Sequence, residues 1–197
     1  AKAALEIDRK ITKNSISIYV GIPFCPTRCV YCSFISAAVE KNAALIEPYL
    51  DALCGEAEAT GALLQEYGLP IDGLYIGGGT PTTLSSKQLD RLLGVLERSF
   101  DLSRLFDYTV EAGRPDTITA EKLAVLRAHG VTRVSVNPQS MDDAVLRLAG
   151  RPHTAQAVLE SYELARKSGF PVINMDVIAG LEGDTPESFA LTMDTLI

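Results

Sequence analysis

The sequence contains no tryptophan, only two histidines and four cysteines, and few aromatic residues of any kind, at 7%. Four cysteines in 197 residues are too few to hold a disulfide-built fold together. No apolar run approaches the roughly 20 residues that a transmembrane helix needs. The charged and mixed stretch 1–14 lacks the pattern of a signal peptide. We therefore expect no membrane span and a cytoplasmic location.

Basic residues are also in short supply, since 18 Lys and Arg stand against 25 Asp and Glu, for a net charge of −7. A nucleic-acid partner usually requires a basic face, so we expect none. Hydrophobic residues at 47% and charged residues at 22% are typical of a folded globular protein. At this length, folding should hide roughly 70% of the unfolded chain's surface, which is enough for one large core.

Patterns typical of strands and helices alternate along the chain. Strands are expected at 15–22, 74–76, 108–111, 133–137 and 172–179. Helices are expected at 46–67, 85–99, 119–129, 141–148, 154–168 and from 185 onward. Such alternation predicts a parallel sheet in an α/β fold. A closed barrel of eight units usually takes ~250 residues, so we expect a partial (β/α) TIM-type barrel of about five β/α units, truncated from a longer protein.

Three of the four cysteines lie within eight residues, as Cys25, Cys29 and Cys32 in a CxxxCxxC spacing. Three neighbouring thiolates suit an iron–sulfur cluster or a zinc ion in a reducing compartment. No histidine lies nearby, and Cys54 shares an apolar helical face with Leu50, so we expect it to be a buried core residue. The loop then leaves one coordination position open for a small molecule. A zinc site completed by a distant ligand is the alternative.

Further polar residues fall at the expected carboxyl ends of strands, where α/β proteins bind ligands. The glycines of the segment 77–81 (GGGTP) let a ligand approach the backbone. Glu111 ends the third expected strand, Gln139 follows the fourth, and Arg151 lies twelve residues on. Asp176 lies inside the fifth, which is a costly place for an unpaired carboxylate. The alternatives are a plain tight turn, a solvated edge charge and a structural ion pair.

The segment Tyr19–Cys32 (YVGIPFCPTRCVYC) resembles the signature of radical S-adenosylmethionine (SAM) enzymes. More narrowly, this segment and the stretches GGGTP and DVIAGL resemble the oxygen-independent coproporphyrinogen III oxidase group, also called coproporphyrinogen dehydrogenases. The resemblance runs from Tyr19 to Leu181. It implies a [4Fe–4S] cluster held by Cys25, Cys29 and Cys32, with the fourth iron chelated by the amino and carboxylate groups of SAM.

The same resemblance implies SAM contacts at the polar positions above and at two tyrosines. The implied contacts are Tyr19, Tyr31, Gly78, Gly79, Thr80, Glu111, Gln139, Arg151 and Asp176. Arg151 suits the methionine carboxylate as a planar fork, whereas Asp176 and Gln139 suit ribose hydroxyls. The best-known branch of the group holds a second SAM. For the tyrosines, core packing is the alternative.

The activity that the resemblance implies is that of a radical SAM oxidoreductase. An electron from a donor such as flavodoxin or ferredoxin cleaves SAM to methionine and a 5′-deoxyadenosyl radical. In the oxidase group this radical takes a hydrogen from a propionate of coproporphyrinogen III. Loss of CO₂ and of one further electron gives a vinyl group, and two such events make protoporphyrinogen IX in haem biosynthesis.

Two positions depart from the group. Gly21 stands where many members have histidine, and Phe34 stands where the best-known branch has a further cysteine, so the chain resembles a second branch more closely. A radical SAM methyltransferase of the same group and a non-enzymatic haem chaperone stay open as alternatives. We expect 1–14 to be an N-terminal lead-in, and 15–197 to be a radical SAM catalytic core without its last strands and substrate domain.

Overall fold

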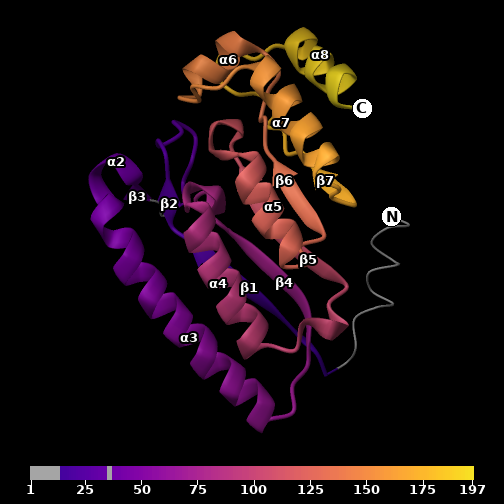
Figure 1. The fold of residues 1–197 in the computed structure, drawn as a ribbon. Helices are drawn as coiled ribbons and strands as arrows, with labels where there is room; N and C mark the ends of the chain where they lie inside the picture. Colours follow the sequence, from indigo (N-terminus) through magenta and orange to yellow (C-terminus); the bar gives the residue numbers. More distant parts are fainter. Residues whose placement is uncertain (1–13, 35–36) are drawn as a thin grey trace.

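The computed structural model describes residues 14–34 and 37–197, which are arranged around a five-stranded sheet in the order β1-β4-β5-β6-β7 (Figure 1). These strands are β1 (Ile16–Ile22), β4 (Ile71–Gly78), β5 (Asp107–Gly113), β6 (Arg133–Val136) and β7 (Val172–Asn174). All four pairings are parallel. The expected α/β fold, a partial (β/α) TIM-type barrel of five units, is therefore confirmed. Two short strands, β2 (Phe24–Cys25) and β3 (Ala37–Ala38), pair beside the cysteine loop.

Helices follow the strands along the chain. They are α2 (Val39–Asn42), α3 (Ile46–Glu66), α4 (Ser86–Ser99), α5 (Ala120–Ala128), α6 (Asp143–Leu148), α7 (Ala155–Lys167) and α8 (Pro186–Leu196). Of these, α3, α4, α5 and α7 lie side by side over one face of the sheet (Figure 1). Short 3-10 turns occupy Ala43–Leu45, Pro81–Thr83, Leu102–Arg104 and Pro115–Thr117. Within the part of the chain that the structure describes, no helix has the length and apolar character to cross a bilayer.

Local capping chemistry explains where the helices begin. Ser85 accepts a hydrogen bond from the Gln88 amide at 3.3 Å, and the Ser85 amide donates to Gln88 Oε1 at 2.8 Å. This reciprocal pair of hydrogen bonds is a capping box. Thr185 caps α8, and Pro186 occupies the first turn, where its missing N–H leaves no bond unmade.

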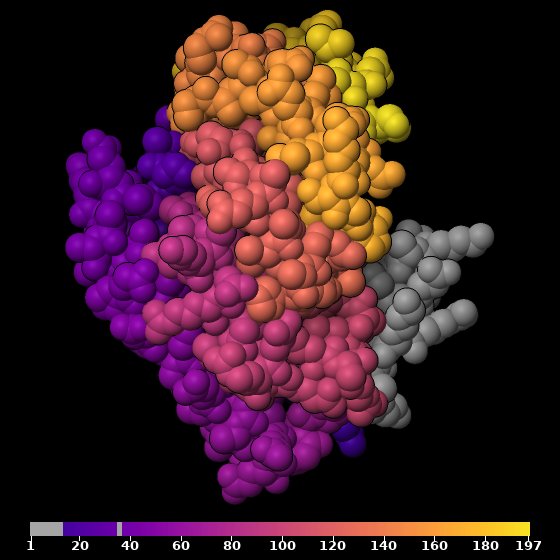
Figure 2. All heavy atoms as spheres, viewed as in Figure 1, coloured from indigo at the N-terminus to yellow at the C-terminus, as the bar shows by residue number. Residues whose placement is uncertain are grey.

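The core lies between the helices and one face of the sheet. Leu74 and Ile76 of β4 and Val110 of β5 are at most 1% exposed, and they share one apolar cluster with Leu92 and Leu96 of α4. In the space-filling view of this side, the side chains of the helices close over the sheet (Figure 2). We call this side of the sheet the helix-covered face.

The alternate residues of the same strands point to the other face. Register pairs Tyr19 with Tyr75 and Tyr75 with Thr109, and it pairs Glu111 with Ser135 and Ser135 with Asn174. We call this set, Tyr19, Tyr75, Thr109, Glu111, Ser135 and Asn174, the polar face. Since parallel strands end at one edge, the polar face leads directly to the loops that follow β4, β5, β6 and β7.

Three strands differ from expectation. β5 was expected at 108–111 but continues to Gly113, so Glu111 lies inside the strand and not at its end. β4 is longer than 74–76, because it pairs with β1 from Ile71 as far as Gly78. The fifth strand was expected at 172–179 but ends at Asn174. β6, its pairing partner, ends at Val136, and Pro138 has no N–H to donate, so only an isolated bridge between Gln139 and Val177 follows. The expectation that Asp176 lies inside a strand is therefore wrong.

Candidate functional site

A pocket of about 410 Å³ opens at the carboxyl ends of the parallel strands. Its walls are the cysteine loop, the ends of β4 and β5, the segment after β6 and the segment after β7. Predicted site residues in its lining are Cys25, Cys29, Cys32, Tyr31, Gly78, Gly79, Thr80, Glu111, Gln139, Arg151 and Asp176. Of the predicted set, Tyr19 alone lies outside the lining. The fold thus gathers side chains that are scattered over most of the sequence.

The three thiols line the same pocket without closing on one another. Cys25 Sγ lies 3.6 Å from Thr80 Oγ1, and Cys29 Sγ lies 3.9 Å from Arg151 Nη1. All three cysteines are free and half-buried. Among the described residues, no three Cys, His, Asp or Glu side chains are close enough together to hold a metal ion. Binding a metal therefore requires these three side chains to turn inward over it.

The chemistry of the pocket fits a thiolate-bound iron–sulfur cluster beside a polar ligand. Three cysteine thiolates can bind three irons of a [4Fe–4S] cluster, which leaves the fourth iron without a protein ligand. Asn137 Oδ1, Gln139 Oε1 and Arg151 Nε are buried and have no hydrogen-bond partner. Such atoms are normally satisfied, and all three residues line the pocket, so a polar ligand there would supply the missing partners.

The glycine segment holds the cysteine loop close to β4. A Cβ on Gly78, whose φ is +113°, would lie 2.9 Å from the Ile22 carbonyl oxygen. A Cβ on Gly79 would lie 2.9 Å from Cys25 Sγ. The Gly79 amide donates to Ile22 at 2.8 Å, and the Thr80 amide donates to Phe24 at 2.8 Å. The expected close approach is thus made here by the chain's own backbone, which carries Cys25 into the pocket.

Glu111 is supported by aromatic residues of the polar face. The Tyr75 hydroxyl donates to Glu111 Oε1 at 2.6 Å. The Tyr75 ring stacks on Tyr19 with centroids 5.8 Å apart, while Tyr19 remains 61% exposed. Burial raises the pKa of Glu111, and the hydrogen bond from Tyr75 opposes that rise. Glu111 is therefore a half-buried, fixed acceptor and not a freely solvated edge charge.

Arg151 is 4% exposed and reaches across the pocket to the cysteine loop. Its Nη2 donates to the Asn137 carbonyl at 2.7 Å and to the Gly113 carbonyl at 3.3 Å, and its Nη1 donates to the Tyr31 hydroxyl at 2.9 Å. Burial raises the pKa of Tyr31 to about 12, although the Arg151 charge acts to lower it. The guanidinium is thus held in position, and Nε is left for a further acceptor.

Asp176 and Gln139 face the pocket from the segments that follow β7 and β6. Asp176 is exposed, and its Oδ1 accepts a hydrogen bond from Asn174 Nδ2 at 2.7 Å. The backbone N–H of Gln139 donates to the backbone carbonyl of Asp176 at 3.0 Å, and Gln139 has a φ of 68°, in the left-handed region. The strand ends before Asp176, so its carboxylate lies at the pocket rim.

Several residues of this lining were not predicted from the sequence, among them Thr27, Arg114 and Asn137. Arg114 is 3% exposed and contacts the cysteine loop at Thr27. A charged residue directly after a strand, with Asp116 two positions on, is a signal that could have identified it. Asn137 was placed at the end of a strand but not considered as a ligand contact.

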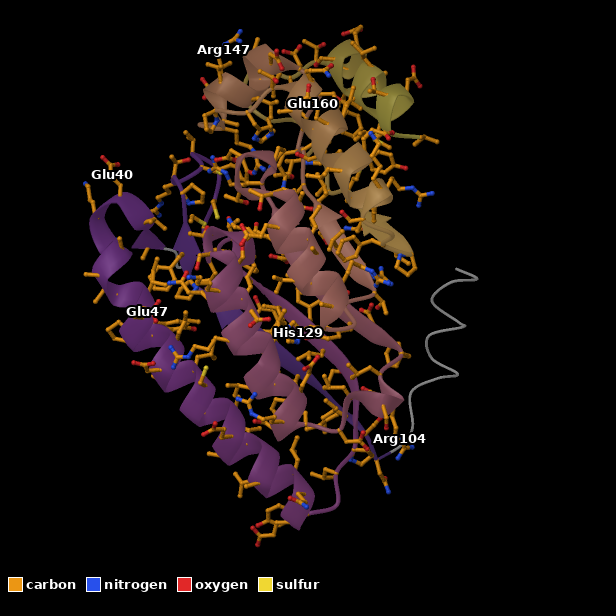
Figure 3. All side chains as sticks on the ribbon, in the orientation of Figure 1. Glu40, Glu47, Arg104, His129, Arg147 and Glu160 are labelled. Atoms are coloured by element: carbon orange, nitrogen blue, oxygen red, sulfur yellow. The ribbon has the colours of Figure 1, made fainter. Side chains whose placement is uncertain are left out.

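The two histidines, His129 and His153, and the fourth cysteine, Cys54, are not part of the pocket lining. His129 sits between α4 and α5, 3.0 Å from Asp90 and 2.9 Å from Glu97 (Figure 3). Burial acts to lower the pKa of His129, but the two carboxylates raise it overall. His153 is buried, and burial lowers its pKa to about 4. Cys54 is 6% exposed within the core, so the expectation of a buried residue is confirmed.

The chain is similar to a known protein family and to named relatives. The family model described as the radical SAM superfamily matches residues 19–196. The oxygen-independent coproporphyrinogen-III oxidase-like protein HemZ of Bacillus subtilis is 44% identical, over 90% of this chain and 36% of its own length. Heme chaperone HemW of the same organism is 36% identical, over 92% of this chain and 47% of its own. This chain therefore spans less than half of either relative.

Solved structures agree with the family match. Coproporphyrinogen III oxidase (HemN) from Escherichia coli superposes with a TM-score of 0.82 at 32% identity, covering 100% of this chain and 44% of that one. An archaeal Elp3 from Methanocaldococcus infernus, at 20% identity and a TM-score of 0.55, shows likeness of fold alone. The resemblance seen in the sequence motifs is confirmed by these matches.

Proposed function

The chain belongs to the radical SAM superfamily, and we propose that it binds a [4Fe–4S] cluster at Cys25, Cys29 and Cys32 with SAM in the pocket beside them. Such a cluster, when bound, supplies the electron that cleaves SAM to methionine and a 5′-deoxyadenosyl radical. The observation that carries the proposal is the single pocket lined by three thiols and by polar side chains from four successive strand ends.

Each polar residue has a role that suits its contacts. Arg151, held on two carbonyls, offers its unpartnered Nε to a carboxylate. Glu111, aimed by Tyr75, accepts from the amino group of the ligand or from its hydroxyls. Gln139 and Asp176 suit ribose hydroxyls, and Tyr31 suits the adenine. Carbonyl groups of Gly78 and Gly79, with Thr80, suit the amino group, and Tyr19 borders the site from its stack on Tyr75.

The proposed substrate is a porphyrinogen, as the names of the matched oxidases suggest. The radical would take one hydrogen atom from a propionate side chain. The propionate then loses CO₂, and one electron passes to an acceptor, which leaves a vinyl group. A small redox protein such as flavodoxin or ferredoxin would donate the electron that starts the cycle. Reactive thiols of this kind suit a reducing, cytoplasmic compartment.

Haem binding without chemistry is the second candidate function. It is favoured by the 36% identity with a protein named as a heme chaperone, over 92% of this chain. Both candidates share the cluster and SAM pocket, so the pocket does not separate them. We propose that residues 15–197 are the cofactor-binding part of a radical SAM core, and that substrate contacts come mainly from further strands and a further domain. The expected lead-in at 1–14 lies, except for Asn14, outside the described residues.

Anaerobic reconstitution with iron and sulfide, followed by SAM turnover under reducing conditions, tests the proposal. We expect 5′-deoxyadenosine from the protein, and vinyl product on addition of coproporphyrinogen III when the proposed further strands and domain are present. Cys29→Ala should abolish both, whereas Cys54→Ala, which removes a thiol outside the pocket, should leave cluster content unchanged. Haem binding with no 5′-deoxyadenosine would favour the chaperone, and a protein that takes up no cluster would refute the main proposal.

A further inference from the structure

Arg114 is almost completely buried directly after the carboxyl end of β5, at 3% exposure. Arginine is rarely buried to this extent unless it is paired. Its Nε donates to Asp116 Oδ1 at 3.0 Å, and its Nη2 donates to Asp116 Oδ2 at 3.0 Å. Because Asp116 lies only two residues on, in the 3-10 turn Pro115–Thr117, the guanidinium plane is oriented by its own segment. This two-point pairing is the geometry that distinguishes arginine from lysine.

The remaining nitrogen of the fork reaches the cysteine loop. Arg114 Nη1 donates to Thr27 Oγ1 at 2.7 Å and to the Thr27 carbonyl at 3.3 Å. Thr27 lies between Cys25 and Cys29 and lines the same pocket as both. The contact therefore joins the end of β5 to the stretch of loop between the first two thiols.

The other half of the loop is attached elsewhere. The Val30 amide donates to the Ala149 carbonyl at 3.1 Å, and Arg151 donates to the Tyr31 hydroxyl at 2.9 Å. The path of the loop between Cys25 and Cys32 is thus held from two sides by buried arginines. Arg151 is already part of the proposed SAM site, whereas Arg114 lines the pocket without a proposed contact to SAM.

We propose that Arg114 is a positioning residue that holds the cysteine loop ready for metal loading. The inference rests on the proposed function, since it concerns how the three thiols come to a metal. The thiols stand apart in this structure, and ordering a free loop around a metal would cost backbone entropy for every residue fixed. A loop whose path is already set by Arg114 loses less entropy when its side chains turn inward, which is the advantage of preorganisation.

Two variants weaken the contact to different degrees. Arg114→Gln removes the fork, so the thiols of the metal-free protein should react with iodoacetamide several-fold faster, and iron uptake on reconstitution should fall several-fold. Thr27→Val removes only the hydroxyl acceptor and leaves the carbonyl, so both changes should have the same direction and a smaller size. Arg91→Gln is the matched control, because Arg91 pairs with Asp51 on the helix layer and should leave both readouts unchanged.

The readouts separate this inference from the proposed function. If the unaltered protein takes up no cluster, the proposed function fails, and the alkylation rates still report on the loop. If Arg114→Gln folds and matches the unaltered protein in alkylation rate, iron content and the electron paramagnetic resonance signal of the reduced cluster, the inference is overturned. If Arg114→Gln does not fold, Thr27→Val decides alone, and unchanged alkylation and iron content in that variant overturn the inference.

Discussion

The two faces of the central sheet have opposite chemistry, although the same strands build both. On the helix-covered face, Leu74 and Ile76 are at most 1% exposed and belong to the apolar core. On the polar face, the intervening Tyr75 donates a hydrogen bond to Glu111 and stacks on Tyr19. The alternation of side chains along each strand therefore separates the two tasks. One face contributes buried apolar area, and the other contributes groups that a ligand can meet.

The largest effect on stability is expected from a core residue of the helix-covered face. Leu92 of α4 is 0% exposed, so Leu92→Ala should lower the free energy of unfolding by about 2–5 kcal/mol through lost burial and a new cavity. Tyr19→Ala on the polar face should cost about 1 kcal/mol or less, because that ring is mostly exposed. Chemical denaturation measures both. Equal losses in the free energy of unfolding at the two positions would contradict the proposal that it is mainly the helix-covered face that contributes to stability.

The next effect concerns ligand affinity at the edge of the polar face. Arg151→Lys keeps the charge but loses the planar fork, so SAM affinity should fall by roughly 10-fold or more. Equilibrium binding of SAM to the reconstituted protein measures this. Arg133→Lys is the control, since Arg133 pairs with Asp107 at the opposite end of the strands and should leave SAM affinity as it is.

A smaller effect is expected from the hydroxyl that aims Glu111. Tyr75→Phe removes a hydrogen bond that lowers the pKa of Glu111, so this pKa should rise further above its ordinary value. If SAM binding needs the carboxylate form of Glu111, the acidic limb of the pH profile of SAM binding should move to higher pH. The lost hydrogen bond should also lower the free energy of unfolding by about 1 kcal/mol. Binding measured across pH 4 to 8 checks the shift. An unmoved limb would show that Tyr75 does not tune Glu111.

The raised pKa of Glu111 also affects how the stability of the protein depends on pH. Because folding raises the pKa of Glu111, this side chain takes up a proton more readily in the folded protein than in the unfolded chain. The contribution of Glu111 to stability is therefore greatest below the ordinary carboxyl pKa and is lost as the pH rises through the raised one. Glu111→Gln should remove this part of the pH dependence in denaturation curves.

The smallest effect lies outside both faces, between α4 and α5. The pKa of His129 is raised overall by Asp90 and Glu97, so its contribution is fully present below the unfolded pKa and is lost as the pH rises through the folded value. Because the two carboxylates are largely exposed, the loss should stay below about 1 kcal/mol. Denaturation at pH 5 and pH 8 of the unaltered protein and of His129→Gln measures it, as the part of the difference that the substitution removes. The buried His153, whose pKa is lowered to about 4, also contributes to that difference in both proteins.

Much of the fold was predictable from local patterns. The helix starts at Ser85 and Thr185 and the parallel sheet follow from short-range patterns, and the structure agrees. The end of the fifth strand was not predictable, because the apolar run 172–179 reads as strand while its partner β6 stops at Val136. Strand length depends on the neighbour that supplies hydrogen bonds, and a single segment carries no record of that neighbour.

The amino-acid sequence by itself determined the helix starts, the α/β order and the three closely spaced thiols, because each depends on residues only a few positions apart. Only the tertiary structure decided that Tyr75 aims Glu111 and that Arg114 holds Thr27. These partners lie 36 and 87 positions apart. Parallel pairing of β1, β4 and β5 brings them together, since side chains distant in sequence become neighbours only when their strands share a sheet edge.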